Sequence, residues 1–187
     1  MALRLNVIIA STRPGRVGPA VAKWFEAYAS EKSDFDVHLV DLADFELPIY
    51  NEPKHPRMQD YKHDHTKRWA ESVDAADAYV FVTPEYNYHP TPALVNAFTY
   101  VSKEWGYKPA SFVSYGGASG GTRAADATRT WFSPLKMMPI PEAIMAPMVF
   151  PQIQDGVFTP NDLQIDSADA MLKELHRWAE ALKPLRG

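Results

Sequence analysis

The chain has 187 residues, of which 46% are hydrophobic and 22% are charged, and its formal net charge is −4. These values are typical of a single globular domain over residues 1–187 and exclude a disordered or fibrous chain. The lack of a basic run argues against binding to nucleic acid, and the lack of cysteine excludes disulfides, cysteine nucleophiles and cysteine-ligated metals.

No stretch contains the roughly 18 apolar residues that a membrane-spanning helix needs. The apolar run after Arg4 is too short for a signal peptide. Together with the lack of cysteine, these features predict a cytoplasmic protein that does not associate with a membrane.

Short apolar runs alternate with helical patterns along the whole chain. Strands are predicted at 5–10, 35–40, 78–82 and 110–115 with a fifth beginning at 143–145, and helices at 17–30, 66–76, 92–103, 120–132 and 167–182. This alternation predicts an α/β fold with a five-stranded parallel sheet and helices on both faces. Such sheets bind ligands beyond the carboxyl ends of the strands, so the loops after strands one, three and four are the expected site.

The loop after the first predicted strand has the composition of a phosphate-binding loop. It opens a helix, whose N-terminal amides and dipole favour an anion. Ser11 and Thr12 add hydroxyl donors, and Arg13 and Arg16 add charged donors. The loop matches neither the P-loop nor the three-glycine dinucleotide motif. A helix-capping loop with two solvated arginines is the alternative.

The loop after the third predicted strand is stiff and aromatic. Between Thr83 and Pro92 it contains several prolines together with Tyr86 and Tyr88. A rigid aromatic loop at the carboxyl end of a strand suits a planar ring ligand. A proline-rich turn with surface tyrosines would have the same composition.

The loop after the fourth predicted strand, from Tyr115 to Gly121, contains four glycines. Glycine lets the backbone approach a ligand closely, although a flexible turn before a helix would have the same composition. The three loops together make a stronger case than any one of them, because parallel strands bring them to the same edge of the sheet.

The three loops together resemble one known family, the NADPH-dependent FMN reductases of flavodoxin-like fold, which include quinone, azo-dye and chromate reductases. The matching motifs are Ser11-Thr12-Arg13-Pro14-Gly15-Arg16, Pro84-Glu85-Tyr86-Asn87, and Tyr115-Gly116-Gly117 with Ser119-Gly120-Gly121. The resemblance covers roughly residues 4–150 and implies the strand order 2-1-3-4-5. The first loop departs from the commoner family form in containing Pro14 and Arg16.

The resemblance also implies how the matching residues would hold FMN. The phosphate would contact Ser11, Arg13, Arg16, Val17 and Gly18; the isoalloxazine ring would lie along Pro84, Glu85, Tyr86 and Asn87; and Tyr115, Gly116, Gly117 and Ser119 would close its other side. Which of the two arginines contacts the phosphate stays open.

The implied activity is hydride transfer from NADPH or NADH, through FMN, to a quinone or another small acceptor such as a flavin, an azo dye or chromate. Because the cofactor performs the chemistry, no catalytic side chain is predicted. A flavodoxin-like electron carrier and a flavin-binding module without turnover are the alternatives. The physiological acceptor and the choice between NADPH and NADH stay open.

Two further features bear on metals and on assembly. His63 and His65 lack a third ligand, so no metal site is predicted. Aromatic residues around the site loops and the helices that follow them are expected at the surface, and exposed aromatic side chains are enriched in interfaces. Together with the resemblance, these aromatic residues predict a homodimer or a dimer of dimers. The residues are Tyr86, Tyr88, Trp105, Tyr107 and Trp131.

Overall fold

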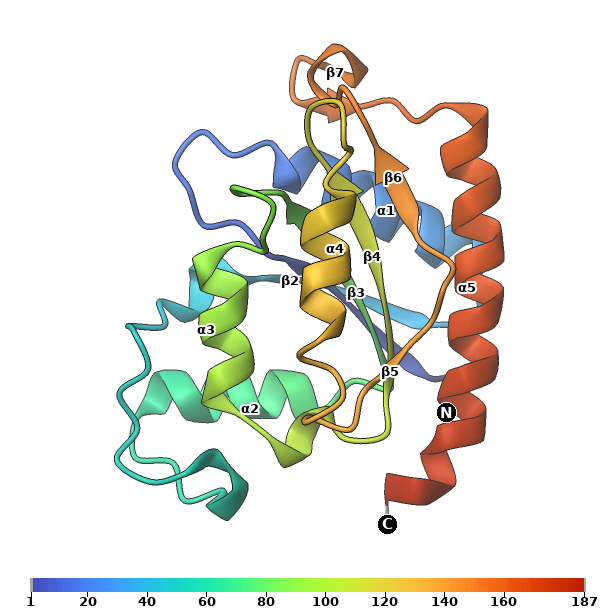
Figure 1. Cartoon of the computed structure of the whole chain (residues 1–187). Coiled ribbons are helices and arrows are strands. Elements are labelled where there is room, and N and C mark those ends of the chain that lie inside the picture. The colour runs from blue at the N-terminus through green and yellow to red at the C-terminus, as the bar shows by residue number, and fades with distance from the viewer. Residues whose placement is uncertain (1, 187) are drawn as a thin grey trace.

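The computed structural model describes residues 2–186, which form a central parallel sheet covered by helices on both faces (Figure 1). The main elements in chain order are β1 (Arg4–Ile9), α1 (Gly18–Lys32), β2 (Asp36–Asp41), α2 (Asp64–Asp74), β3 (Ala78–Pro84), α3 (Pro92–Tyr100), β4 (Pro109–Tyr115), α4 (Thr122–Arg129), β5 (Met138–Pro139), β6 (Ile144–Ala146) and α5 (Asp162–Leu182).

The strand order is β2-β1-β3-β4-β5, and every neighbouring pair is parallel. This is the order found in flavodoxin, and it confirms the predicted α/β fold. Ile9 lies beside Val82, and Pro84 lies beside Tyr115. The loops after β1, β3 and β4 therefore leave adjacent strands at the same edge of the sheet.

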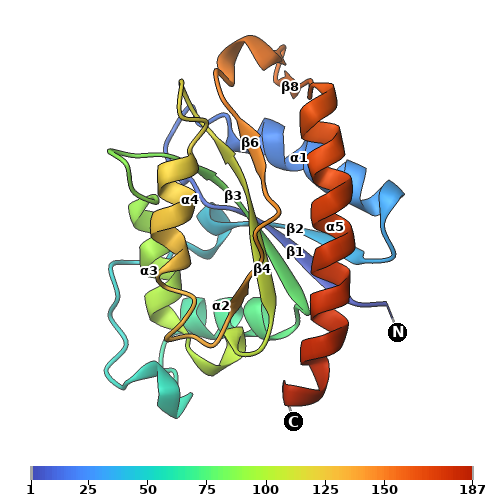
Figure 2. The same ribbon diagram turned by 45° about the vertical axis from the view of Figure 1, so that its right-hand side comes forward.

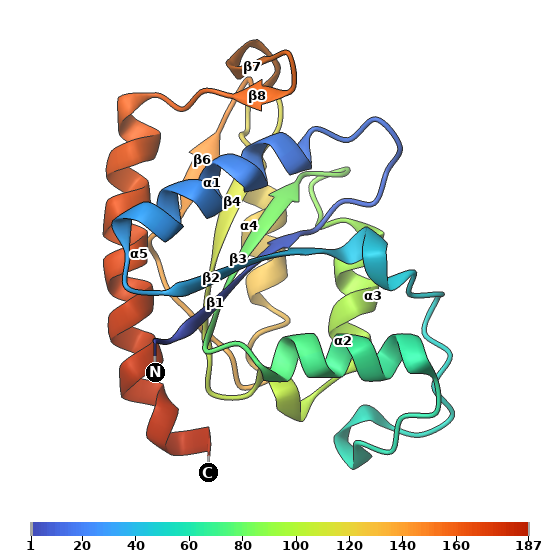
Figure 3. The ribbon, with the colours of Figure 1, turned by 180° about the vertical axis from the view of Figure 1, so that it is seen from behind.

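Successive side chains along each strand point to opposite faces of the sheet, where they pack into two separate apolar layers. On β1, Val7 and Ile9 pack in the layer that contains α1 and α5, whereas Ile8 packs with α2, α3 and α4. Figure 2 shows the sheet between α5 on one side and α3 and α4 on the other, and Figure 3 shows α1 crossing the opposite face from α3 and α4. All seven residues of β3 are buried, as predicted for a strand covered on both faces.

The fifth strand differs from the prediction, because it consists of two short pieces. Both β5 and β6 pair with β4. Pro139 and Pro141 have no backbone N–H, so a continuous ladder of hydrogen bonds cannot form here.

The last helix begins at Asp162, five residues before the predicted start at Ser167. A capping box explains the difference: the Gln164 amide donates to the Asn161 side chain at 3.0 Å, and the Asn161 amide donates to the Gln164 side chain at 2.9 Å. Just before it, β7 (Ile153–Gln154) and β8 (Val157–Phe158) form a hairpin that was not predicted.

The remaining boundaries move by a few residues. The predicted helix at 92–103 is α3 followed by the turn η3 (Lys103–Trp105), the predicted helix at 120–132 contains the shorter α4, and α2 begins two residues early. Two further 3₁₀ turns, η1 (Leu42–Phe45) and η2 (Pro56–Met58), lie in the segment between β2 and α2.

Two of the aromatic residues expected near the site loops do not lie there. Trp105 is fully buried, with its ring 4.9 Å from that of Tyr79, so it belongs to the core. Tyr107 lies two residues before the start of β4, at the opposite edge of the sheet from the loops. Both residues precede β4 in the sequence. In a parallel sheet, residues that precede a strand lie at the edge where the strands begin, whereas the site loops lie at the edge where they end.

Among the helices of residues 2–186, none combines the length and the apolar character that crossing a membrane requires.

Candidate functional site

The first loop presents free backbone amides at the start of α1. Val17 precedes the helix and provides no side-chain cap. Within residues 2–186, the amides of Thr12, Arg13 and Gly15 donate no backbone hydrogen bond either. A β-turn shapes this loop: the Arg16 amide donates to the Arg13 carbonyl at 3.2 Å, and Gly15 has a φ of +71°. The loop is therefore suited to an anion.

The two arginines of this loop have different surroundings. The Arg16 guanidinium donates to both carboxylate oxygens of Asp41, at 2.6 and 2.5 Å, and also to the Ser11 carbonyl. The hydrogen bonds to Asp41 raise the pKa of Arg16 against the effect of burial. Arg13 is exposed, and its side chain has no hydrogen-bond or ion-pair partner within the described residues. Arg16 thus holds the loop, and Arg13 is available to a ligand.

Two tyrosines from the neighbouring loops reach back to the first loop. The Tyr86 hydroxyl lies 3.0 Å from the Ser11 hydroxyl. The Tyr115 hydroxyl packs so closely on Gly18 that a Cβ there would lie 2.6 Å from it. Burial raises the pKa of Tyr115, so its hydroxyl stays protonated at neutral pH. These contacts explain why α1 begins with glycine.

The second loop is a tight turn rather than a flexible segment. Tyr86 and His89 exchange two backbone hydrogen bonds of 2.9 Å. Asn87 and Tyr88 between them have φ values of +51° and +72°, as in a type I′ turn. At the end of the loop, Thr91 donates to the Ala10 carbonyl and so connects the loop to the end of β1.

Glu85 joins the second loop to the third. Its side chain is only 8% exposed and accepts hydrogen bonds from the Arg123 side chain at 2.7 Å and from Ser119 at 3.2 Å. Burial alone would raise the pKa of Glu85, but the bonds from Arg123 and Ser119 outweigh it and hold the pKa below its ordinary value. The Arg123 guanidinium also lies over the Tyr88 ring, 3.7 Å from its centre.

The third loop is held by its backbone. The amides of Met148 and Val149 donate to the Gly117 and Gly116 carbonyls at 2.9 and 3.0 Å. Gly121 has a φ of +77°, and a Cβ there would lie 2.7 Å from the Tyr115 carbonyl oxygen. A Cβ at Gly117, by contrast, would meet no atom within 4 Å. The loop is therefore rigid at its base and open at Gly117.

A family model described as NADPH-dependent FMN reductase matches residues 3–150. The chain belongs to the NADPH-dependent FMN reductase family. The match contains all three loops, and it confirms the family that the sequence motifs resemble.

Individual relatives agree with the family. The chain is 35% identical over 160 residues to an NAD(P)H-dependent FMN reductase of Schizosaccharomyces pombe, covering 84% of this chain and 79% of the relative. It is 31% identical over 147 residues to a quinone reductase of Pseudomonas putida, covering 74% of this chain and 75% of the relative.

The fold is also shared with FerB, a flavoenzyme NAD(P)H:(acceptor) oxidoreductase from Paracoccus denitrificans. The TM-score is 0.74 at 18% identity, with 97% of this chain and 99% of FerB covered. At this identity the similarity shows the fold alone.

The structure brings the predicted site residues of this reductase-family chain to one edge, and it adds residues that the motifs did not contain. Asp41 ends β2 at this edge and holds Arg16. Arg123 at the start of α4 is bound to Glu85. Arg129 at the end of the same helix donates to the Ile140 carbonyl at 2.7 Å. The position of Asp41 after a predicted strand was the one signal available for it.

Proposed function

We propose that the three loops bind FMN and that the protein transfers reducing equivalents from NADPH or NADH to a quinone or a similar small acceptor. The observation that carries this proposal is the uncapped N-terminus of α1, which lies beside a rigid aromatic turn on the adjacent strand. The family membership of the chain supports the same cofactors.

The first loop fits the phosphate of FMN. Its amides supply hydrogen-bond donors, and Arg13, which has no partner among residues 2–186, supplies positive charge. The Ser11 hydroxyl is near enough to Tyr86 to be oriented by it. Arg16, Val17 and Gly18 hold the loop in shape: Arg16 through Asp41, and Gly18 through its contact with Tyr115.

The second and third loops fit the ring of a flavin. The backbone of Pro84, Glu85, Tyr86 and Asn87 would lie along the ring, and the open space at Gly117 leaves room on its other side. Tyr115, Gly116 and Ser119 support this wall. Glu85 binds both Ser119 and Arg123, so the second loop is fixed relative to the third loop and to the start of α4.

FMN, when bound, accepts hydride from a nicotinamide and passes electrons to an acceptor. The chain contributes binding, orientation and exclusion of water rather than an acid or a base. The Pseudomonas putida relative is named a quinone reductase, and we extend that acceptor class to this chain. Flavins, azo dyes and chromate belong to the same proposal.

The test is steady-state oxidation of NADPH and of NADH by the FMN-saturated protein, with and without benzoquinone. We expect a yellow protein and an oxidation rate that rises with quinone concentration. Failure to bind FMN at micromolar concentration would contradict the flavin site. FMN binding without NAD(P)H oxidation would instead favour the electron carrier or the flavin-binding module.

The proposal also covers the organisation of the chain. We propose that residues 1–187 act as a single domain, because both apolar layers share the same sheet. We propose a homodimer or a dimer of dimers as the assembled state. A cytoplasmic location follows from the proposed reductant, since NAD(P)H is an intracellular cofactor.

A further inference from the structure

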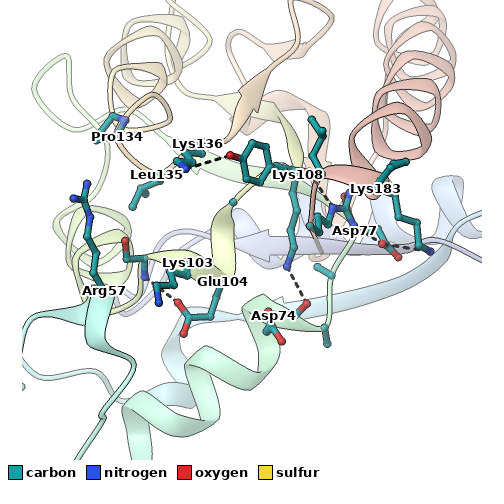
Figure 4. Close-up of a pocket in the computed structure, with 18 residues that line it drawn as sticks. Arg57, Asp74, Asp77, Lys103, Glu104, Lys108, Pro134, Leu135, Lys136 and Lys183 are labelled. Carbon is teal, nitrogen blue, oxygen red and sulfur yellow. Dashed lines mark hydrogen bonds and ion pairs between the residues drawn. The ribbon is translucent and has the colours of Figure 1, made fainter.

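A second cavity lies at the opposite edge of the sheet from the three loops. It has a volume of about 970 Å³ and is lined by Arg57 and by residues from the segments 74–77, 102–108, 134–136 and 183–186 (Figure 4). β3, which is seven residues long, separates this edge from the loops by roughly 23 Å at 3.3 Å per residue. We call it the amino-edge cavity, and none of the flavin loops contributes to it.

The lining of this cavity carries excess positive charge, with six basic and three acidic side chains. Asp77 is already paired with Arg186 at 2.5 Å and lies 3.8 Å from Lys183. Glu104 is buried, and it accepts hydrogen bonds from neutral groups, including the Tyr61 hydroxyl at 2.7 Å.

The other four basic side chains of the lining have no acidic partner among residues 2–186. Within residues 2–186, no carboxylate lies within ion-pair distance of Arg57, Lys103, Lys108 or Lys136. Figure 4 shows Arg57 and Lys103 on one side of the cavity and Lys136 above it.

Lys108 is the buried member of this group. It is 4% exposed, and its ammonium donates to the carbonyls of Val73 and Asp74, at 3.0 and 2.9 Å. An ammonium has three donors, so these two carbonyls leave one donor of Lys108, a residue of the cavity lining, without a hydrogen bond in the described residues. Burial lowers the pKa of Lys108 to about 8, and the charge of the more distant Asp74 offsets this only in part. An anion in the cavity would supply the missing counter-charge.

The rim of the cavity is held in an unfavourable backbone conformation. Tyr107 and Lys136 have φ values of +58° and +57°, and the Tyr107 amide donates to the Lys136 carbonyl at 2.8 Å. Their side chains also meet, since the Lys136 ammonium lies 3.2 Å from the Tyr107 hydroxyl. Non-glycine residues in this region concentrate at functional sites. The conformation places an aromatic ring and a cation at the same rim.

We propose that the amino-edge cavity binds a mononucleotide-sized organic phosphate. Its phosphate groups would contact Lys108, Lys103 and Lys136, and its ring would pack on Tyr107 and Leu135. The volume lies in the range of small-molecule sites, about 300–1,000 Å³, and exceeds what a single inorganic ion fills. This site is separate from the flavin site and does not depend on it.

The test uses the full-length protein saturated with FMN and titrated with metal-free ADP. We expect saturable binding by calorimetry, with amide NMR shifts at Tyr107, Lys108 and Lys136 and none in the loop from Thr12 to Gly18. Inorganic phosphate should bind at least tenfold more weakly than ADP, because it has no ring. Shifts confined to the flavin loops, or no saturation at millimolar ADP, would overturn the proposal.

The variant K103Q/K136Q should weaken ADP binding at least tenfold. Its matched control is K23Q/K173Q, which removes two exposed lysines of α1 and α5 that do not line the cavity. The control should bind ADP like the wild type. Equal weakening in both variants would mean that ADP responds only to net charge, and it would overturn the site. Under conditions in which K108M is folded, it should also lose ADP binding while it retains FMN binding.

Discussion

The two arginines of the first loop differ in what they are free to do. Arg16 uses its guanidinium on Asp41 and on the Ser11 carbonyl, whereas Arg13 is exposed without a partner in the described residues. We therefore assign the phosphate contact to Arg13 and a positioning role to Arg16. In the sequence, Arg13 and Arg16 are equal candidates for the contact with the FMN phosphate, and their different partners in the structure are the reason for this assignment.

Replacing Arg13 by alanine should weaken FMN binding by about 10- to 150-fold. A charge-assisted hydrogen bond contributes about 1.5–3 kcal/mol, and each 1.4 kcal/mol is about tenfold in affinity. Fluorescence titration measures the change. R177A, at an exposed arginine of α5, is the control and should bind FMN normally. Riboflavin lacks the phosphate and should bind wild type and R13A about equally; equal weakening of both ligands would contradict the assignment.

Replacing Glu85 by glutamine should lower the free energy of unfolding by about 1–2 kcal/mol at pH 7. Hydrogen bonds to charged groups contribute about 1.5–3 kcal/mol, and Arg123, which is 47% exposed, recovers part of this from water. Urea denaturation measures the difference. E174Q removes a surface ion pair on α5 between the half-buried Glu174 and the exposed Arg177 and should cost less than about 0.5 kcal/mol.

The effect of Glu85 should depend on pH in one direction. The pKa of Glu85 in the folded protein lies below its ordinary value of 4.5. Its contribution to stability is therefore complete above about pH 4.5 and is lost as the pH falls through the folded pKa. The stability difference between wild type and E85Q should shrink in acid. A difference that grows below pH 4.5 would show that the carboxylate is not stabilised as described.

At the scale of elements, the start of α4 depends on one glycine. Gly121 has a φ of +77°, and a Cβ there would lie 2.7 and 2.8 Å from the Tyr115 backbone oxygen and nitrogen. Both atoms belong to Tyr115, the last residue of β4, where the third loop begins. Neither atom can move without disturbing the sheet. Gly156 has a similar φ of +78° in the β7–β8 hairpin, but a Cβ there would meet nothing within 4 Å.

G121A should therefore destabilise the protein by about 2–5 kcal/mol. The left-handed conformation costs alanine about 1–2 kcal/mol, and overpacking adds about 1–3 kcal/mol. G156A should cost only the first of these. Thermal unfolding of the two variants gives the comparison. Similar losses for both would mean that the backbone conformation, and not the contact with Tyr115, determines the requirement for glycine.

At the scale of the whole molecule, exposed apolar side chains gather in one part of the chain. From β6 to the first turn of α5, five large apolar residues are at least 52% exposed: Met145, Met148, Phe150, Val157 and Leu163. The segment follows the third loop and binds it through the backbone of Met148. An interface here would lie beside the proposed flavin site.

We expect sedimentation equilibrium to show a dimer, and M148S/F150S to weaken it at least tenfold. Buried apolar side chains carry much of the energy of an interface. Ile49, which is 91% exposed in the segment between β2 and α2, provides the control variant I49S, which should remain dimeric. A mass of one chain at both low and high wild-type concentration would contradict the dimer.

Much of the fold could be predicted from local patterns. Runs such as Ala78–Val82 are apolar throughout, and their burial on both faces follows from a parallel sheet. The misplaced boundaries have local causes as well: the capping box at Asn161 extends α5, and prolines divide the fifth strand. Asp155 and Gly156 form an Asp-Gly turn, which is a hairpin signal, but the residues around them have the composition of a loop.

The sequence by itself determined the α/β architecture and the three loops, because hydrophobic period, glycine and proline act over a few neighbouring residues. Only the tertiary structure decided how the side chains pair. Asp41 meets Arg16 across 25 positions, and Glu85 meets Arg123 across 38. The amino-edge cavity is lined by Arg57 and by four further segments that are separate in the sequence. Such contacts depend on strand order and register, which bring residues that are distant in the sequence to the same edge of the sheet. A local sequence pattern does not contain this information.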